Sequence, residues 1–178
     1  MTRLAIPVGA SDHAQGPEAA PVTIVEYGDY ECPYCGEAYP ALKALARAAG
    51  PRLRFVFRNF PLAEMHPHAL HAAAFAEAAA EAGRFWEAHD LLYENQAALG
   101  DAHLLGYGDR LGLDPAAVRA ALAGRYADRI RADFLGGVRS GVNGTPTLFV
   151  NGLRYDGPRD LESLAALVQG LSPSIPAA

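Results

Sequence analysis

Apolar and polar positions along the chain predict strands at both ends of a long helical segment. Residues 22–28, VTIVEYG, are apolar on both faces and rich in β-branched side chains, which is typical of a buried central strand. Apolar residues then recur with helical spacing over residues 36–50, and Gly50 marks the end of that helix. Residues 52–61 alternate apolar with charged or exposed side chains, so they predict a second strand.

From about residue 66 to residue 139 no strand pattern occurs, and Ala, Leu, Glu and Arg dominate. The spacing predicts helices at about 67–82, 84–97, 101–111, 115–122 and 125–140, with glycines at most of the breaks. No heptad is sustained, which favours a packed helical subdomain over a coiled coil.

The third segment predicts a β-hairpin followed by a helix. Residues 147–150 and 153–155 are strand-like and flank Asn151-Gly152, the strongest short-range signal for a hairpin turn. Residues 158–168 then carry an amphipathic helical pattern, and we expect the tail over residues 171–178 to be loose.

This order of elements predicts an α/β fold. A strand, a helix and a second strand form a βαβ unit with parallel strands, and the helical block interrupts the chain before the antiparallel hairpin. We therefore divide the chain into an N-terminal arm (1–20), an α/β domain built from residues 21–62 and 141–171, and a helical insertion (63–140).

Composition excludes several classes of protein. The chain has 178 residues, 51% of them hydrophobic, and a formal net charge of −5. This length supplies a core without disulfide staples. The acidic balance argues against a nucleic-acid partner, and no apolar run approaches the roughly 18 residues that membrane insertion needs. No heptad or sticky edge stands out, so we expect a monomer.

The first 20 residues do not resemble a secretory signal. The apolar run over residues 4–10 is short and is broken by Pro7, and the acidic Asp12 and Glu18 fall where a signal peptide would be apolar or small. We expect an uncleaved, partly ordered arm and a cytoplasmic protein, unless an export signal has been removed.

The only two cysteines, Cys32 and Cys35, lie in the stretch EYGDYECPYCG. A structural zinc site needs four ligands, and the chain has no second CxxC. The histidines of MHPHALH could complete a site in principle, but only His66 and His71 have a usual ligand spacing. We favour a redox pair over structural zinc and over a structural pair of buried cysteines.

The expected strand–helix junction gives the two thiols different chemistry. Cys32 lies at the N-terminus of the helix, where unpaired N–H groups and the helix dipole favour an anion, so its pKa falls from about 8.5 toward 3.5–7.5. Pro33 suits the first helical turn. Cys35 lies one turn further in, more buried and with a higher pKa. Cys32 is therefore the candidate nucleophile, reached from solvent, and Cys35 the candidate resolving thiol.

At this point the sequence resembles the DsbA-like thiol–disulfide oxidoreductase family of the thioredoxin superfamily. The resemblance is carried by DYECPYCG, FRNFPL, the His-Pro pair near residue 66, FWEAHDLLYENQ and VNGTPTLFVNG, and it covers roughly residues 16–170. It implies a thioredoxin-like α/β fold, a central mixed sheet flanked by helices, with an inserted all-helical subdomain.

The resemblance also implies roles for matched residues. Glu26 corresponds to a buried acid behind the active site that moves the proton of Cys35, which requires a raised pKa. Pro146 corresponds to a cis-proline facing the cysteines, and the backbone at Thr145 to an edge that pairs with an extended substrate segment.

Between the cysteines the chain departs from the best-known family pattern, because Pro33-Tyr34 replaces Pro-His. Both residues are candidate substrate contacts. Tyr34 cannot offer the thiolate a positive charge, so we expect a less depressed Cys32 pKa and a reduction potential between about −120 mV for DsbA and about −270 mV for thioredoxin.

Other polar residues have structural interpretations. Phe85, Trp86, His89 and Leu92 share a helical face that predicts core packing, and His68 and His71 are interpreted as capping or exposed residues. Arg52, Arg54 and Arg58 predict a solvated strand face.

The residues together predict an enzyme, a protein thiol–disulfide oxidoreductase that needs no cofactor or metal because Cys32 and Cys35 are its redox group. Its partners would be protein or small-thiol disulfides and an unidentified redox partner. Two alternatives stay open: a glutaredoxin-like reductase of small thiols, and a non-catalytic CxxC module that binds a metal or a partner. The sequence leaves the direction of exchange open.

Overall fold

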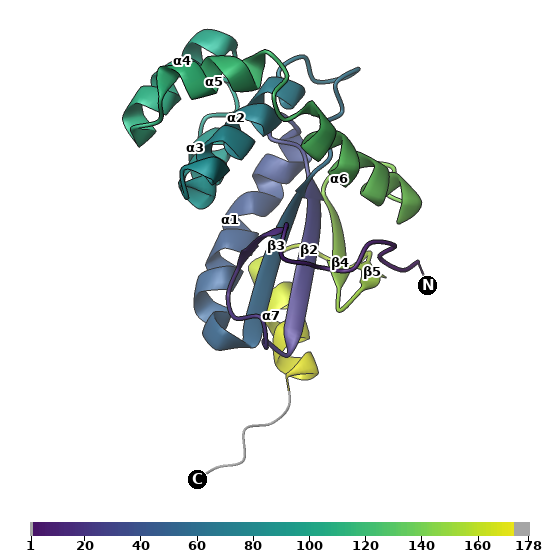
Figure 1. Cartoon of the computed structure of the whole chain (residues 1–178). Helices are drawn as coiled ribbons and strands as arrows, with labels where there is room; N and C mark the ends of the chain where they lie inside the picture. The colour runs from purple at the N-terminus through teal and green to yellow at the C-terminus, as the bar shows by residue number, and fades with distance from the viewer. Residues whose placement is uncertain (1, 173–178) are drawn as a thin grey trace.

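A five-stranded mixed sheet forms the centre of the computed structural model, which describes residues 2–172 (Figure 1). Its strands are β1 (His13–Gln15), β2 (Val22–Gly28), β3 (Leu53–Asn59), β4 (Thr147–Val150) and β5 (Leu153–Tyr155), in the spatial order β1-β3-β2-β4-β5. β2 and β3 are parallel, and the other pairs are antiparallel. The predicted βαβ unit and the Asn151-Gly152 hairpin are therefore confirmed.

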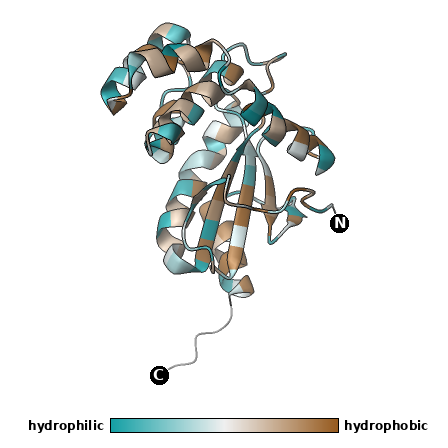
Figure 2. Cartoon of the chain, in the orientation of Figure 1, coloured by the Kyte–Doolittle hydropathy of each residue, from teal (hydrophilic) through white to brown (hydrophobic). Residues whose placement is uncertain are grey.

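Helices cover both faces of the sheet, and the alternation of side chains along β2 explains how. Ile24 and its same-face neighbours pack against α1 (Pro33–Ala49) and α7 (Leu161–Leu171), and α1 and α7 contact each other. Val25 and Tyr27 point to the opposite face, toward α6 (Ala127–Arg139). In Figure 2 the central strands are coloured mainly as hydrophobic, as expected for a sheet buried on both faces.

The helical block matches the pattern of the sequence closely. It consists of α2 (Ala69–Glu81), α3 (Phe85–Tyr93), α4 (Asp101–Leu111), α5 (Pro115–Leu122) and α6. The helix predicted over residues 84–97 ends at Tyr93. α2 lies at the centre of the block, contacting α3, α4, α5 and α6, and its alanines allow this close packing.

The N-terminal arm is more ordered than its sequence indicates. Its β1 pairs with β3 at one edge of the sheet, while Arg3 forms an antiparallel bridge with Leu153 at the other edge. Figure 1 shows the arm crossing in front of the sheet between these two points. The expectation of a merely partly ordered segment missed β1, because three residues of mixed polarity carry no strand period.

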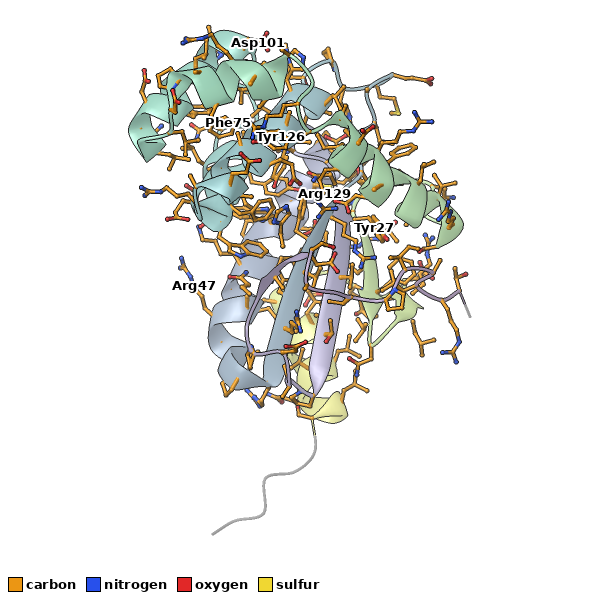
Figure 3. The ribbon with its side chains drawn as sticks, viewed as in Figure 1. Tyr27, Arg47, Phe75, Asp101, Tyr126 and Arg129 are labelled. Carbon is orange, nitrogen blue, oxygen red and sulfur yellow. The ribbon has the colours of Figure 1, made fainter. Side chains whose placement is uncertain are left out.

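The sequence predicted that Arg58 lies on a solvated strand face, and this prediction was wrong. Arg54 is half-buried, but Arg58 is only 3% exposed. Arg58 makes a bidentate pair with Asp12 of the arm, at 2.7 and 2.9 Å, and also donates to the Tyr27 hydroxyl. Figure 3 labels Tyr27 on β2 and Arg129 on α6, which line the same cavity as Arg58. The sequence missed this burial because the arm that covers Arg58 lies 46 residues away in the chain.

Two further expectations concern the membrane and the chain end. Among residues 2–172, no helix combines the length and the apolar character needed to cross a bilayer. Residues 173–178 of the expected loose tail lie outside the described residues. The division into arm, α/β domain and insertion stays a prediction.

Candidate active site

Cys32 occupies the N-cap of α1, with extended backbone angles, and Pro33 follows at the first helical position. The N–H groups of Cys35 and Gly36 both donate to the Cys32 carbonyl oxygen, at 3.1 Å. Proline starts a helix at this position because its missing N–H costs no hydrogen bond. The local sequence therefore places the first cysteine at the positive end of α1 and the second one turn inside it.

The environment separates the pKa values of the two thiols. The pKa of Cys32 is lowered to about 5, first by a hydrogen bond from the Cys35 thiol, against the opposing effect of burial, and further by Thr145 and the N–H groups at the start of α1. Burial, above all, raises the pKa of Cys35 well above its ordinary value. At neutral pH, Cys32 is a thiolate and Cys35 a thiol, which is the distribution that a nucleophile and a resolving thiol require.

Both sulfurs are well covered. Cys32 is 3% exposed and Cys35 0%, so the expected difference in exposure exists but is small. Both cysteines are free in this structure. On the surface beside Cys32, Pro33 and Tyr34 are exposed, Tyr34 by 68%.

The turn before β4 lies against Cys32. The peptide bond between Thr145 and Pro146 is cis, and the Cys32 sulfur lies 3.4 Å from the carbonyl oxygen of Thr145. Thr147 Oγ1 donates to the Gly144 carbonyl oxygen at 2.7 Å and so closes the turn. The structure thus brings together two motifs that are 113 residues apart in the chain.

Glu26 is buried behind the cysteines, 2% exposed, on the face of β2 that points to α1. Burial raises the pKa of Glu26 to about 8; Arg159 lowers it and the Cys32 charge raises it. Its Oε1 has no hydrogen-bond partner within residues 2–172. An unpaired buried carboxyl of this kind exchanges protons near neutral pH.

A cavity of about 150 Å³ connects Glu26 with the surface between α1 and α3. Its lining includes Tyr39, Lys43 and Asp90, which form one hydrogen-bonded group: Tyr39 donates to Asp90 at 2.7 Å, and Lys43 donates to the Tyr39 oxygen at 2.7 Å. A cavity of this size has room for several water molecules, which could satisfy Glu26 and carry its proton. His89 also lines this cavity and burial lowers its pKa to about 3, so it is neutral there.

The helical face of α3 that was expected to pack in the core contributes both to the core and to the cavity. Phe85 and Leu92 are buried in the core, as predicted. Nδ1 of His89 lies within hydrogen-bonding distance of the Tyr30 hydroxyl, at 3.2 Å. His89 also lines the cavity beside Glu26. Its partner Tyr30, in the turn after β2, and the cavity could not be predicted from helical spacing alone.

Gln96 ends the motif FWEAHDLLYENQ, but the sequence analysis assigned it no role. Its side-chain amide donates to the carbonyl oxygens of Tyr30 and Cys32, at 2.8 and 2.9 Å, and so fixes the backbone on both sides of the cysteine turn. A Cβ on Gly36 would lie 2.0 Å from Gln96 Oε1, so only glycine admits this contact. The glycine directly after CPYC was the available signal, since it suggests a close approach.

Asp29 and His66 were also underestimated. Asp29 is buried, and its carboxylate accepts hydrogen bonds from the backbone N–H groups of Glu31 and Leu62, at 2.8 and 2.9 Å. His66 Nδ1 lies 2.8 Å from the same carboxylate. His68 and His71 are not part of this group: His68 precedes α2 and is exposed, and His71 pairs with Asp101. Within residues 2–172, no three His, Cys, Asp or Glu side chains gather as a metal site would require.

Comparison with known proteins identifies the family. A sequence model of the family described as Thioredoxin matches residues 10–170. The chain belongs to the thioredoxin family. The chain is similar in structure to a thioredoxin-like oxidoreductase from Silicibacter pomeroyi DSS-3, with a TM-score of 0.79 and 25% identity over 91% of this chain and 92% of that one.

It is also similar to the thiol-disulfide exchange protein alpha-DsbA2 from Wolbachia pipientis, with a TM-score of 0.78 and 23% identity over 92% of this chain and 88% of that one. Both neighbours share the thioredoxin-like fold of this chain. The fold class and the thioredoxin superfamily expected from the sequence are therefore confirmed.

One curated relative is a much longer protein than this chain. The chain is 50% identical over 167 residues, 93% of its length, to the Na(+)/H(+) antiporter NhaA 1 of Salinispora arenicola (strain CNS-205). It spans only 26% of that relative. The likeness therefore concerns one part of the antiporter.

Proposed function

We propose that this protein exchanges disulfides with protein substrates, with Cys32 as the nucleophile and Cys35 as the resolving thiol. The observation that supports this best is the opposite shift of the two thiol pKa values, Cys32 down to about 5 and Cys35 up, at the start of one helix. A structural or metal-binding pair has no need of such a difference, whereas stepwise exchange depends on it.

In the oxidising direction a substrate thiolate attacks the Cys32 sulfur of the Cys32–Cys35 disulfide. The bond to Cys35 breaks, and Cys35 leaves as a thiolate that takes a proton. A second substrate thiolate then attacks the substrate sulfur of the mixed disulfide and releases Cys32 as a thiolate. Two electrons have passed to the enzyme, and an external disulfide must remove them. The reducing direction is the reverse sequence.

Glu26 is our candidate for the group that gives Cys35 its proton and takes it back. Its pKa of about 8 lets it donate and accept at neutral pH, and the cavity beside it leads to solvent. The Thr145 carbonyl oxygen beside Cys32 would accept a hydrogen bond from a backbone N–H of the bound substrate segment. Pro33, Tyr34 and Pro146 would flank that segment.

The reduction potential is the experiment that tests this function. We expect a reversible two-thiol couple between about −120 and −270 mV, because a Cys32 pKa of about 5 lies between about 3.5 for DsbA and about 7 for thioredoxin. Equilibration in glutathione buffers, with the thiol state followed by alkylation, measures it. A potential at the reducing end would fit a cytoplasmic reductase. If no reversible couple formed, a metal-binding or partner-binding CxxC module would replace our proposal.

Replacing Glu26 with Gln should slow exchange at pH 7, on the order of tenfold to a hundredfold, because Cys35 loses its proton acceptor. Stopped-flow tryptophan fluorescence or thiol trapping measures the step that Cys35 performs. Glu37→Gln is the matched control, since Glu37 lies exposed on α1 close to the cysteines. Equal rates in the two variants would remove Glu26 from the mechanism.

The same Glu26→Gln substitution should stabilise the fold above pH 5. The folded-state pKa of Glu26, about 8, exceeds its ordinary 4.5, so its carboxyl costs stability progressively as pH rises from about 4.5 to about 8. Gln has no such cost. We expect a gain of about 2–4 kcal/mol in the free energy of unfolding at pH 7.5 and almost none at pH 4, measured with urea. A gain independent of pH would contradict the raised pKa.

A further inference from the structure

One buried carboxylate fastens the loop between β3 and α2 to the turn that precedes Cys32. Asp29 has a completely buried side chain, and its Oδ2 receives both the N–H of Leu62 and the imidazole Nδ1 of His66. Its Oδ1 receives the N–H of Glu31. The side chain of His66 is 15% exposed, so it is partly withdrawn from water at this point.

The backbone of Asp29 contacts the redox pair itself. Its carbonyl oxygen accepts a hydrogen bond from the N–H of Cys32 at 3.2 Å. His66 is therefore linked to Cys32 through a single residue.

The charges around His66 favour its protonated form. Burial lowers the pKa of His66. The hydrogen bond to Asp29 and the negative charges of Asp29, Cys32 and Glu31 raise it by more than burial lowers it, so the net shift of the pKa is upward. These groups come from the β2–α1 turn that faces the imidazole. In the loop that carries His66, the backbone N–H of His68 donates a hydrogen bond to the Glu31 carboxylate at 2.6 Å.

We propose that His66, hydrogen-bonded to the buried carboxylate of Asp29, is a positioning residue whose cationic form stabilises the Cys32 thiolate from outside helix α1. This rests on the proposed function of Cys32. The attraction is mutual: if the thiolate favours the imidazolium, the imidazolium must favour the thiolate by the same free energy. Asp29 and Glu31 place two carboxylates close to Cys32, and the cation of His66 offsets them. Tyr34, between the cysteines, carries no charge that could do so.

Reciprocal titrations test this proposal without any need for turnover. In the reduced protein, NMR should give a His66 pKa that falls by about 0.5 unit when Cys32 is replaced by Ser. Thiolate absorbance near 240 nm should give a Cys32 pKa that rises by a similar amount, about threefold in the ionisation constant, in His66→Gln. The Gln side chain still offers an amide donor for a hydrogen bond to Asp29, and it carries no charge.

Two variants separate charge from structure. His66→Lys keeps a cation at the site and should leave the Cys32 pKa near the wild-type value. His71→Gln breaks a comparable His–Asp pair, 2.6 Å between His71 and Asp101, between α2 and α4, and should have no effect. The proposal is overturned if His66→Gln leaves the Cys32 pKa unchanged, or if His66→Lys shifts it as much as His66→Gln does.

The outcomes also distinguish this inference from the proposed function. Reciprocal shifts in a protein with no exchange activity would support the thiolate–imidazolium pair and overturn the enzyme. Normal exchange activity with no shift in either titration would leave the enzyme intact and overturn the role of His66.

Discussion

Replacing Cys32 with Ser should lower the rate of disulfide exchange by at least about 10³-fold, because a serine hydroxyl is neither ionised at neutral pH nor able to form a disulfide. Cys35→Ser should have a different effect. Cys32 remains a thiolate and still attacks a substrate disulfide, but no second thiol lies beside it to resolve the adduct. Mixed disulfides with the substrate should accumulate and appear on non-reducing gels.

The baseline for both variants is the double replacement of Cys32 and Cys35, which retains the fold and has no thiol. Alkylation of the Cys35→Ser protein with iodoacetamide gives a further reading of the nucleophile. The pKa of Cys32 in that variant should rise from about 5, because the Cys35 thiol is the largest cause of its lowering. If adducts accumulated in Cys32→Ser rather than in Cys35→Ser, the two roles would have to be exchanged.

Elements with a strong local period could be predicted from the sequence. β2 is apolar on both faces, α4 and α5 are bounded by glycine and proline, and Asn151-Gly152 leaves few alternatives to a hairpin. The thiol chemistry was equally local, because a cysteine at a strand–helix junction meets the N–H groups of its own helix. Every such inference used residues within one or two turns of each other.

The remainder of the site depends on contacts between distant segments. Gln96 reaches the cysteine turn from the end of the α3 region, and His66 reaches Asp29 from the loop after β3. A glutamine or a histidine in a loop has no pattern that names its partner. The burial of Arg58 was misread for the same reason, since arginines near the end of a strand usually face water.

Loss of Arg58 should be the most destabilising change outside the redox pair. Its guanidinium makes five hydrogen bonds: two to the Asp12 carboxylate, two to the carbonyl oxygens of Ile6 and Pro7, and one to the Tyr27 hydroxyl. The side chains of Arg58 and Asp12 are only 4% and 6% exposed. Removing one partner of such a pair leaves a buried charge and unpaired carbonyl oxygens, which costs about 3–5 kcal/mol.

Arg58→Met keeps most of the apolar volume and should lower the free energy of unfolding by about 3–5 kcal/mol, or the melting temperature by about 6–20 °C. Arg54→Met is the matched control on the same strand. Among residues 2–172, Arg54 forms one ion pair, which spans 3.7 Å to the 94% exposed Glu18, so its loss should cost less than about 1 kcal/mol. Urea denaturation at pH 7 measures both variants.

The same substitution tests what the arm does for the sheet. Without Arg58, Asp12 loses its bidentate partner, while the β1 pairing and the bridge from Arg3 to β5 remain. Hydrogen exchange should then accelerate first in residues 2–15, while β2 and α1 stay protected. Uniform acceleration across the sheet would instead mean that the arm and the sheet unfold as one unit. Equal stability of Arg58→Met and Arg54→Met would show that the buried ion pair contributes nothing to holding the arm.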